Sequence, residues 1–359
     1  MANKTARLGD LATYINGYAF KPADWGETGL PIIRIQDLTG NSYQLNRYDG
    51  EYPERIEVND GDVLISWSAS LGVYVWQRGK ALLNQHIFKV VFDKLPVNKD
   101  YFVFAVEHKL AEMESKTHGA TMKHIVKKDF DGTTIPYPPI EKQAEIADHL
   151  RRITSLIDRQ TEQLLLLDQL VKSRFIELFG DPQRNPHGYK HTKLSDIATY
   201  YNGLTYKPEN VAAEGTIVLR SSNIQNSQLD FADTIRVDCA IKERLTVQKN
   251  DILMCSRNGS AKLVGKVALI KDIQEPMSFG AFMMIIRSHY FGYLMTYFQM
   301  DAFRQQIKTG ATTTINQITG RMLDDVTIPL PPMALVDQFA AFVEQTDKSK
   351  LCGRMEVAA

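Results

Sequence analysis

Two windows of the chain gather hydroxyl, amide, arginine and aromatic side chains and hold no carboxylate between their bounding aspartates. The first lies between Asp62 and Asp93 and the second between Asp251 and Asp272. Arginine and amide side chains can make paired hydrogen bonds to guanine and adenine edges, whereas lysines and hydroxyls mostly contact the phosphate backbone. Because a face without carboxylates favours phosphate binding, the windows predict a nucleic-acid contact surface in each half of the chain.

The candidate contact residues come from these windows, from one further stretch without carboxylates later in each half (residues 115–128 and 302–323) and from a repeated opening motif. They are Lys21, Ser66, Trp67, Ser68, Arg78, Gln85, His86, Lys116, Lys123, His124, Lys207, Ser256, Arg257, Asn258, Lys262, Lys308 and Thr312. A solvated loop or a capping role is the plainer alternative for each residue. For Lys21 and Lys207, phosphate contact and simple solvation both stay open, and Trp67 is either core or a stacking partner. Arg34 and Arg220 could instead be structural, bonded to carbonyls or to a carboxylate such as Asp62 or Asp251.

Catalytic motifs are missing from the sequence. It has no GxGxxG after a strand, no GxxxxGK[ST], no HExxH and no CxxC pair, and its three cysteines have no metal or redox spacing. We therefore expect a recognition chain that performs no catalysis and binds no cofactor or metal. A free-standing nuclease or methyltransferase is the alternative, and any turnover by the pure chain with DNA, metal and S-adenosylmethionine would support it.

An internal duplication positions the two windows. Residues 7–22 read RLGDLATYINGYAFKP and residues 193–208 read KLSDIATYYNGLTYKP; GAT recurs at 119–121 and 310–312, and TIPYPP at 134–139 matches TIPLPP at 327–332. In each copy we expect a short opening helix that ends at Asn-Gly, a β-rich middle, a helical stretch and a proline pair that starts another helix. Strands are predicted at 30–35, 63–67, 73–76, 87–92, 217–219, 252–255 and 266–270, and helices at 101–115 and 290–307.

A heptad pattern follows the first copy. Its seam residues are Ile146, Leu150, Ile153, Ile157, Leu164, Leu167, Val171 and Leu178. Such a pattern indicates a long helix with a narrow partner-facing stripe, although an ordinary amphipathic core helix is the alternative. The predicted fold class is mixed α/β, with two repeated domains at 1–137 and 181–330, a spacer helix at 138–180 and a short helix at 331–359. An antiparallel pairing of the two helices would relate the domains by a pseudo-two-fold axis.

The overall composition is that of a soluble globular protein. Of the 359 residues, 44% are hydrophobic and 23% charged, with a formal net charge of zero. Taken alone, the zero net charge speaks against a nucleic-acid partner, so that prediction rests on how the charge is distributed. No signal peptide or membrane span is expected, and the cysteine usage fits a reducing cytoplasm.

Taken together, the opening motif with PIIRIQDL or IVLRSSNI, the GAT turn, and IPYPPIEKQAEIADHL with its heptads resemble the specificity subunit of type I restriction-modification systems. The resemblance covers nearly the whole chain. It implies two target-recognition domains that each read half of a split DNA sequence, and spacer helices that dock two methyltransferase subunits, joined by restriction subunits. S-adenosylmethionine would bind to the partner.

The C-terminal helix is shorter than the family pattern leads one to expect. After TIPLPP only Phe339, Phe342, Val343 and Thr346 continue a seam before Gly353. We therefore expect a truncated end, a first helix without a full-length partner in the chain, and self-association or dependence on the partner for solubility; a monomer in gel filtration would contradict this. The alternative function is a shortened regulatory chain that occupies methyltransferase subunits without directing cleavage.

Overall fold

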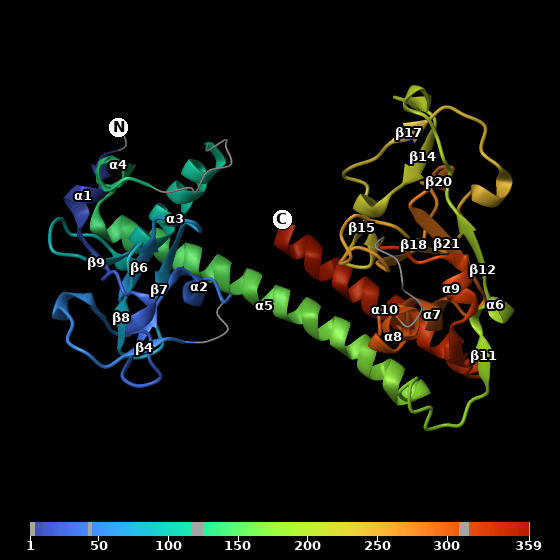
Figure 1. Ribbon diagram of the computed structural model, residues 1–359. Coiled ribbons are helices and arrows are strands. Elements are labelled where there is room, and N and C mark those ends of the chain that lie inside the picture. Colours follow the sequence, from blue (N-terminus) through green and yellow to red (C-terminus); the bar gives the residue numbers. More distant parts are fainter. Residues whose placement is uncertain (1–3, 42–44, 117–124, 309–315, 359) are drawn as a thin grey trace. The chain divides into compact units, whose positions relative to one another are not determined.

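The computed structural model describes residues 4–41, 45–116, 125–308 and 316–358, with the backbone alone for 113–116, 308 and 352–358. The chain forms two compact units, residues 1–158 and 159–359. Both units mix helices with β-sheets (Figure 1), as the sequence predicts. Among the described residues no helix is long and apolar enough to cross a membrane, and no group of three His, Cys, Asp or Glu side chains could hold a metal ion.

The first unit is built around a four-stranded antiparallel sheet in the order β2-β9-β6-β7. A second sheet has the order β4-β3-β8-β5, in which β3 and β8 run parallel, and β1 pairs with β10. The elements are β1 (Thr5–Arg7), α1 (Leu8–Leu11), β2 (Thr13–Asn16), β3 (Leu30–Ile33), α2 (Ile35–Leu38), β4 (Arg47–Tyr48), β5 (Glu57–Val58), β6 (Val63–Ser66), β7 (Gly72–Val75), β8 (Ala81–Leu83), β9 (Ile87–Val91), α3 (Lys99–Lys116), α4 (Lys127–Gly132), β10 (Thr134–Pro136) and the start of α5 (Ile140–Phe179).

The second unit repeats this plan. Its central sheet has the order β12-β21-β18-β19, a second sheet has the order β13-β17-β14-β20 with β14 and β20 parallel, and β11 pairs with β22. The elements are β11 (His191–Lys193), α6 (Leu194–Ile197), β12 (Thr199–Asn202), β13 (Val211–Ala212), β14 (Thr216–Leu219), β15 (Ile224–Gln225), β16 (Gln228–Leu229), β17 (Arg236–Val237), β18 (Ile252–Cys255), β19 (Val267–Leu269), β20 (Met277–Phe279), β21 (Met283–Arg287), α7 (Phe291–Tyr297), α8 (Asp301–Lys308), α9 (Gly320–Asp324), β22 (Thr327–Pro329) and α10 (Met333–Ala358).

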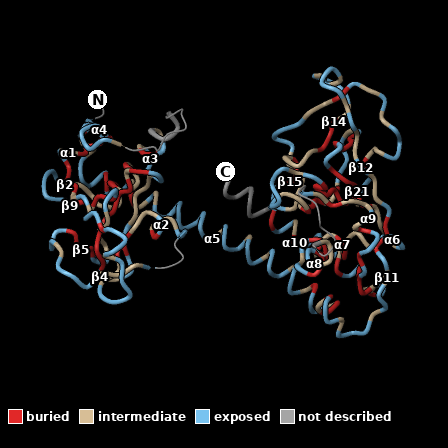
Figure 2. Tube along the Cα trace, viewed as in Figure 1, coloured by how far each residue is buried: buried red, intermediate tan, exposed pale blue. Residues whose placement is uncertain are grey.

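Both faces of each central sheet are covered, which explains why its strands read as continuous apolar runs. In β6, Val63 and Ile65 pack with α3 while Leu64 packs with the second sheet. In β18, Met254 and Cys255 likewise enter opposite cores. Buried residues accordingly follow the strands of both units (Figure 2). The expected strands are thus present to within one residue at their ends, except that β3 stops at Ile33, before the predicted residue 35.

The repeated opening motif does not form the helix that we predicted up to Asn-Gly. Only one turn is helical in each copy, α1 and α6, and the residues that follow are strands β2 and β12. The glycine of the motif has another role: a Cβ on Gly17 would lie 2.0 Å from the Asn84 carbonyl oxygen, and one on Gly203 would lie 2.1 Å from that of Gly280. Only glycine permits so close a backbone contact, so the motif marks a strand end that packs against the turn between β8 and β9, or between β20 and β21 in the second copy.

Both helices predicted from the paired prolines are present, but they begin directly after the prolines, at Ile140 for α5 and Met333 for α10, and not at the predicted residues 138 and 331. The predicted helix at 101–115 is present as α3, whereas the one at 290–307 is divided into α7 and α8. At its beginning, α5 belongs to the first unit: Gln143 is buried, and its amide accepts a hydrogen bond from the backbone N–H of Asn98 and donates to the carbonyl of Pro138.

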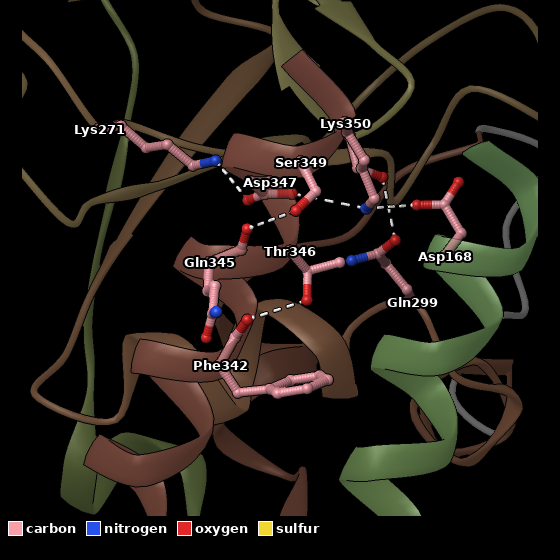
Figure 3. A network of polar contacts seen from close by, with 10 residues as sticks. Asp168, Lys271, Gln299, Phe342, Gln345, Thr346, Asp347, Ser349 and Lys350 are labelled. Atoms are coloured by element: carbon pink, nitrogen blue, oxygen red, sulfur yellow. Dashed lines mark hydrogen bonds and ion pairs between the residues drawn. The ribbon is translucent and has the colours of Figure 1, made fainter. Parts of the chain in front are cut away.

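In the second unit, the last part of α5 packs antiparallel against α10. Phe175 contacts Phe339 with 5.6 Å between ring centroids, Arg174 lies over the ring of Phe342, and Asp168 accepts a hydrogen bond from Lys350 at 2.6 Å. Lys350 also lies 3.4 Å from Asp347, which pairs in turn with Lys271 (Figure 3). Helices α5 and α10 therefore form an antiparallel pair within this unit.

Candidate nucleic-acid interface

Three segments of the second unit meet at one end of its central sheet. They are the loop after β18, the turn between β20 and β21, and the segment that leads into α9. The backbone N–H groups of Ser256 and Arg257 both donate to the carbonyl of Phe282, at 2.9 and 3.1 Å, and Ile318 N–H donates to the carbonyl of Ser256 at 2.7 Å. The turn and the returning segment thus fix the strand-end loop from two sides.

The first unit has the same arrangement with different residues. Trp67 N–H donates to the carbonyl of His86 at 3.3 Å, and Ile125 N–H donates to the carbonyl of Trp67 at 2.9 Å. We call these two surfaces the loop faces. The loop face of the first unit comprises residues 67–70, 84–86 and 125, and that of the second comprises 256–260, 280–282 and 316–318. The shared bonds show that the duplication preserves a scaffold for the loops.

The loop face of the second unit carries an arginine and an amide. The exposed Arg257 donates from Nη2 to Oε1 of Gln317 at 2.7 Å, and its guanidinium carbon lies 5.9 Å from the ring centroid of Phe282. Asn258 is half-buried; its Nδ2 donates to the Ser221 hydroxyl and its Oδ1 accepts from Ser260 N–H. Asn258 therefore orders the loop, while Arg257 projects at its surface.

The loop face of the first unit carries an amide and an imidazole. Gln85 and His86 are both exposed, and His86 has a positive φ of 72°, a strained conformation for a residue other than glycine. Its ring packs edge-on against Trp67, with centroids 5.0 Å apart, and Trp67 stacks on Phe88 at 5.6 Å. Of the two roles left open for Trp67, the structure favours core packing, because the ring is half-buried and packs against the hydrophobic core to which α3 contributes.

The three candidate serines are poorly placed to contact DNA. Ser66, Ser68 and Ser256 are all buried. The hydroxyl of Ser66 donates to the carbonyl of Ser68, and that of Ser256 donates to the carbonyl of Phe282. Buried polar groups need such partners, so the hydroxyls of Ser66 and Ser256 hold the loops in shape, and Ser68 takes part through its carbonyl. We leave all three serines out of the proposed contact surface. Beside them, burial raises the pKa of the Cys255 thiol.

The basic candidates fall into different places. Lys262 is exposed just after the second loop face, whereas Lys21 and Lys207 are exposed ahead of single 3-10 turns. Arg78 lies beyond the other end of β7, where Nη1 donates to the carbonyl of Asp37. It is therefore not on the loop face. Lys116 and Lys308 end α3 and α8 with side chains that are not described, and Lys123, His124 and Thr312 lie outside the described residues.

Arg34 and Arg220, for which a structural role was also considered, do contact carboxylates. These carboxylates are not Asp62 and Asp251, the two that the sequence suggested. Nε of Arg34 lies 3.6 Å from Asp37, and Nη2 of Arg220 lies 2.7 Å from Asp233. The suggested carboxylates are held elsewhere: Asp62 lies 3.5 Å from Lys89, and Asp251 binds Arg287. Pairing of Arg34 with Asp62 and of Arg220 with Asp251 is therefore wrong.

The residues of the predicted seam of α5 differ in solvent exposure along the helix. Among the seam residues, Ile153 and Ile157 are 53% and 43% exposed, while the others are half-buried: Ile146, Leu150, Leu164, Leu167, Val171 and Leu178. The fully buried residues of the last two turns are Phe175 and Phe179, which the heptad assignment did not include. The assignment follows the aliphatic residues and therefore misses the aromatic ones that enter the core.

Sequence reasoning also missed Phe282 and Gln317 on the second loop face. Phe282 is 59% exposed although phenylalanine is usually buried. Structural alignment of the two copies places Phe282 in the turn equivalent to that of Gln85 and His86. The sequences alone do not show this equivalence, because the residue types of the two turns differ.

Comparison with known proteins gives a consistent result. The family model described as the type I restriction modification DNA specificity domain matches residues 2–167 and again 186–351. The chain is 24% identical over 303 residues to the EcoBI specificity subunit of Escherichia coli, covering 76% of this chain and 62% of that protein. It is also 24% identical over 293 residues to the MjaVIII specificity subunit of Methanocaldococcus jannaschii, covering 76% and 68% respectively.

The fold also has solved counterparts. The crystal structure of a type I restriction-modification S subunit from M. genitalium aligns over 99% of this chain and 92% of that one, with a TM-score of 0.59 and 14% identity. A structure that concerns assembly of the type I R-M system aligns over the same shares, with a TM-score of 0.54 and 15% identity. The chain spans under two thirds of the length of the EcoBI subunit.

Proposed function

Because the chain belongs to the family defined by the type I restriction-modification DNA specificity domain, we propose that it is the DNA-recognition subunit of such a system. Each unit reads one half of a bipartite sequence. Helices α5 and α10 contribute to the docking of methyltransferase subunits, of which we expect two. Methyl transfer and cleavage are performed by the partner methyltransferase and restriction subunits in the cytoplasm, with S-adenosylmethionine on the methyltransferase.

One observation carries this proposal: the two loop faces share their backbone hydrogen bonds and differ in their side chains. The bond from Ile125 to Trp67 has its equivalent in the bond from Ile318 to Ser256. The exposed groups are Gln85 and His86 in one copy and Arg257 with Phe282 in the other. A common scaffold with different donors and acceptors is what two readers of unlike half-sites require.

The chemistry of the loop faces fits duplex DNA. Arginine and glutamine have the paired donor or donor-acceptor geometry that matches guanine and adenine in the major groove. The acidic-free windows around them leave the approach of phosphates unopposed by carboxylates, and Lys262 supplies a positive charge next to the second loop face.

A binding selection tests the proposal. The chain, purified with the methyltransferase subunit of its own locus, is incubated with a random duplex library, and the bound fraction is sequenced. We expect enrichment of one sequence with two specified parts and an unspecified gap. Enrichment of a single continuous site, or of none while the complex binds DNA, would contradict a bipartite reader.

A further inference from the structure

Arg257 differs from three other arginines of the second unit in having no carboxylate partner among the described residues. Arg236 and Arg287 each form a two-bond ion pair, with Glu275 and Asp251, and Arg220 lies against Asp233. Within the described part of the chain no carboxylate lies within ion-pair distance of Arg257. No described carboxylate therefore pairs with its charge, and the side chain is exposed on a loop face.

The position of Arg257 is nevertheless fixed. Its backbone N–H is bonded to the carbonyl of Phe282, and the residue forms an isolated β-bridge with Gln317. The side chain has two further supports, the Nη2 bond to Gln317 and the face of the Phe282 ring. Holding a long side chain this way lowers the conformational entropy that binding would otherwise remove.

The supports leave most of the guanidinium available. A guanidinium has five N–H donors in a planar fork, and only one described contact uses them. Two donors on one edge match the O6 and N7 acceptors of guanine, the commonest specific contact of arginine in the major groove. A lysine cannot reproduce this fork, because an ammonium group is a point charge.

The equivalent place in the first unit is built differently. Aligning β6 with β18 places Ser68 opposite Arg257, and Ser68 is buried. The exposed groups there are Gln85 and His86 instead. The arginine fork is therefore specific to the loop face of the second unit.

We propose that Arg257, supported by Gln317 and Phe282, reads a guanine, so that the half-site of the second unit contains a G·C pair that depends on this side chain. This inference rests on the proposed function and names a specificity-determining residue for it. Phe282 is a positioning residue that holds the guanidinium.

Methylome sequencing of cells that produce the methyltransferase subunit with variants of the full chain tests the inference. Arg257→Lys keeps the charge and removes the fork. We expect it to relax one G·C position in one half of the motif, reducing discrimination there on the order of 10- to 100-fold, with the other half unchanged. Lys262→Gln is the matched control, because it removes a charge beside the same loop face and should lower methylation at all sites without changing the motif.

Three outcomes would overturn the guanine assignment. They are an unchanged motif with Arg257→Lys, relaxation at an A·T pair with Arg257→Lys, and a uniform loss with Arg257→Lys that matches the loss with Lys262→Gln. The wild-type chain separates these from failure of the proposed function: if it directs no split motif at all, the function itself is wrong and the inference falls with it.

Discussion

The ion pair between Arg287 and Asp251 holds the central sheet of the second unit at the end opposite its loop face. Asp251 precedes β18 and its side chain is 1% exposed, while Arg287 ends β21. The carboxylate accepts from Nε at 2.7 Å and from Nη2 at 2.8 Å, and a third bond comes from the N–H of Gln248. The hydrogen bonds that Arg287 donates to Asp251 raise the pKa of the guanidinium, which therefore stays charged at neutral pH.

Replacing Arg287 by Met should be costly, because it leaves a buried carboxylate with a single backbone donor. Removing one member of a buried pair costs about 3–5 kcal/mol, and we expect about 3 kcal/mol since the Arg287 side chain is 26% exposed. The first unit supplies the control: Lys89 lies 3.5 Å from Asp62, whose side chain is 28% exposed. Lys89→Met should therefore cost only about 1 kcal/mol.

Thermal unfolding of the full chain measures both effects. For a unit of this size, about 3 kcal/mol corresponds to a fall in Tm of roughly 6–12 °C. The loss should appear in the second unit's transition if the units unfold separately. Adding Asp251→Asn to Arg287→Met should restore part of the stability, because no charge is then buried. Equal losses from Arg287→Met and Lys89→Met, or no recovery in the double variant, would refute the argument.

Three further predictions follow from other contacts. Lys350→Met should cost about 1 kcal/mol, because Asp168 is largely exposed, and should speed hydrogen exchange in α10; unchanged exchange would contradict the role of this contact. Gln85→Ala should change base preference in one half-site by on the order of 1–3 kcal/mol, whereas a uniform loss of affinity would identify a phosphate contact. The hydrogen bonds from Arg236 lower the pKa of Glu275, so this stabilisation is present above about pH 4.3 and is lost as the pH falls through the lower folded-state value. Glu275→Gln should therefore destabilise the chain slightly in urea at about pH 7, and an equal difference at about pH 3 would contradict the assignment.

The fold was largely predictable because the sequence contains two copies of the same pattern. Strands such as β6 and β18 are covered on both faces, so their apolar runs are distinctive, and the proline pairs mark the starts of α5 and α10. The opening motif misled us, because Asn-Gly is also a helix-stop signal. Its glycine serves a long-range contact, Gly17 with Asn84, that local sequence does not reveal.

The candidate contact surface was less predictable than the fold. The acidic-free windows located both loop faces, but a window cannot show which hydroxyls turn inward, and Ser66 and Ser256 do so. The residue type of Phe282 did not reveal its exposure, because that exposure depends on a turn defined by pairing of distant strands. The residue-level contacts of the loop faces with DNA stay predictions.

The central claim is that this chain directs the sequence choice of a partner methyltransferase. Single-molecule methylome sequencing of cells that carry the methyltransferase subunit, with and without the chain, tests it most directly. We expect a split adenine-methylated motif that is present only with the chain. Absence of a new motif, with the chain expressed and bound to its partner, would contradict the account and favour a chain that occupies methyltransferase subunits without directing them.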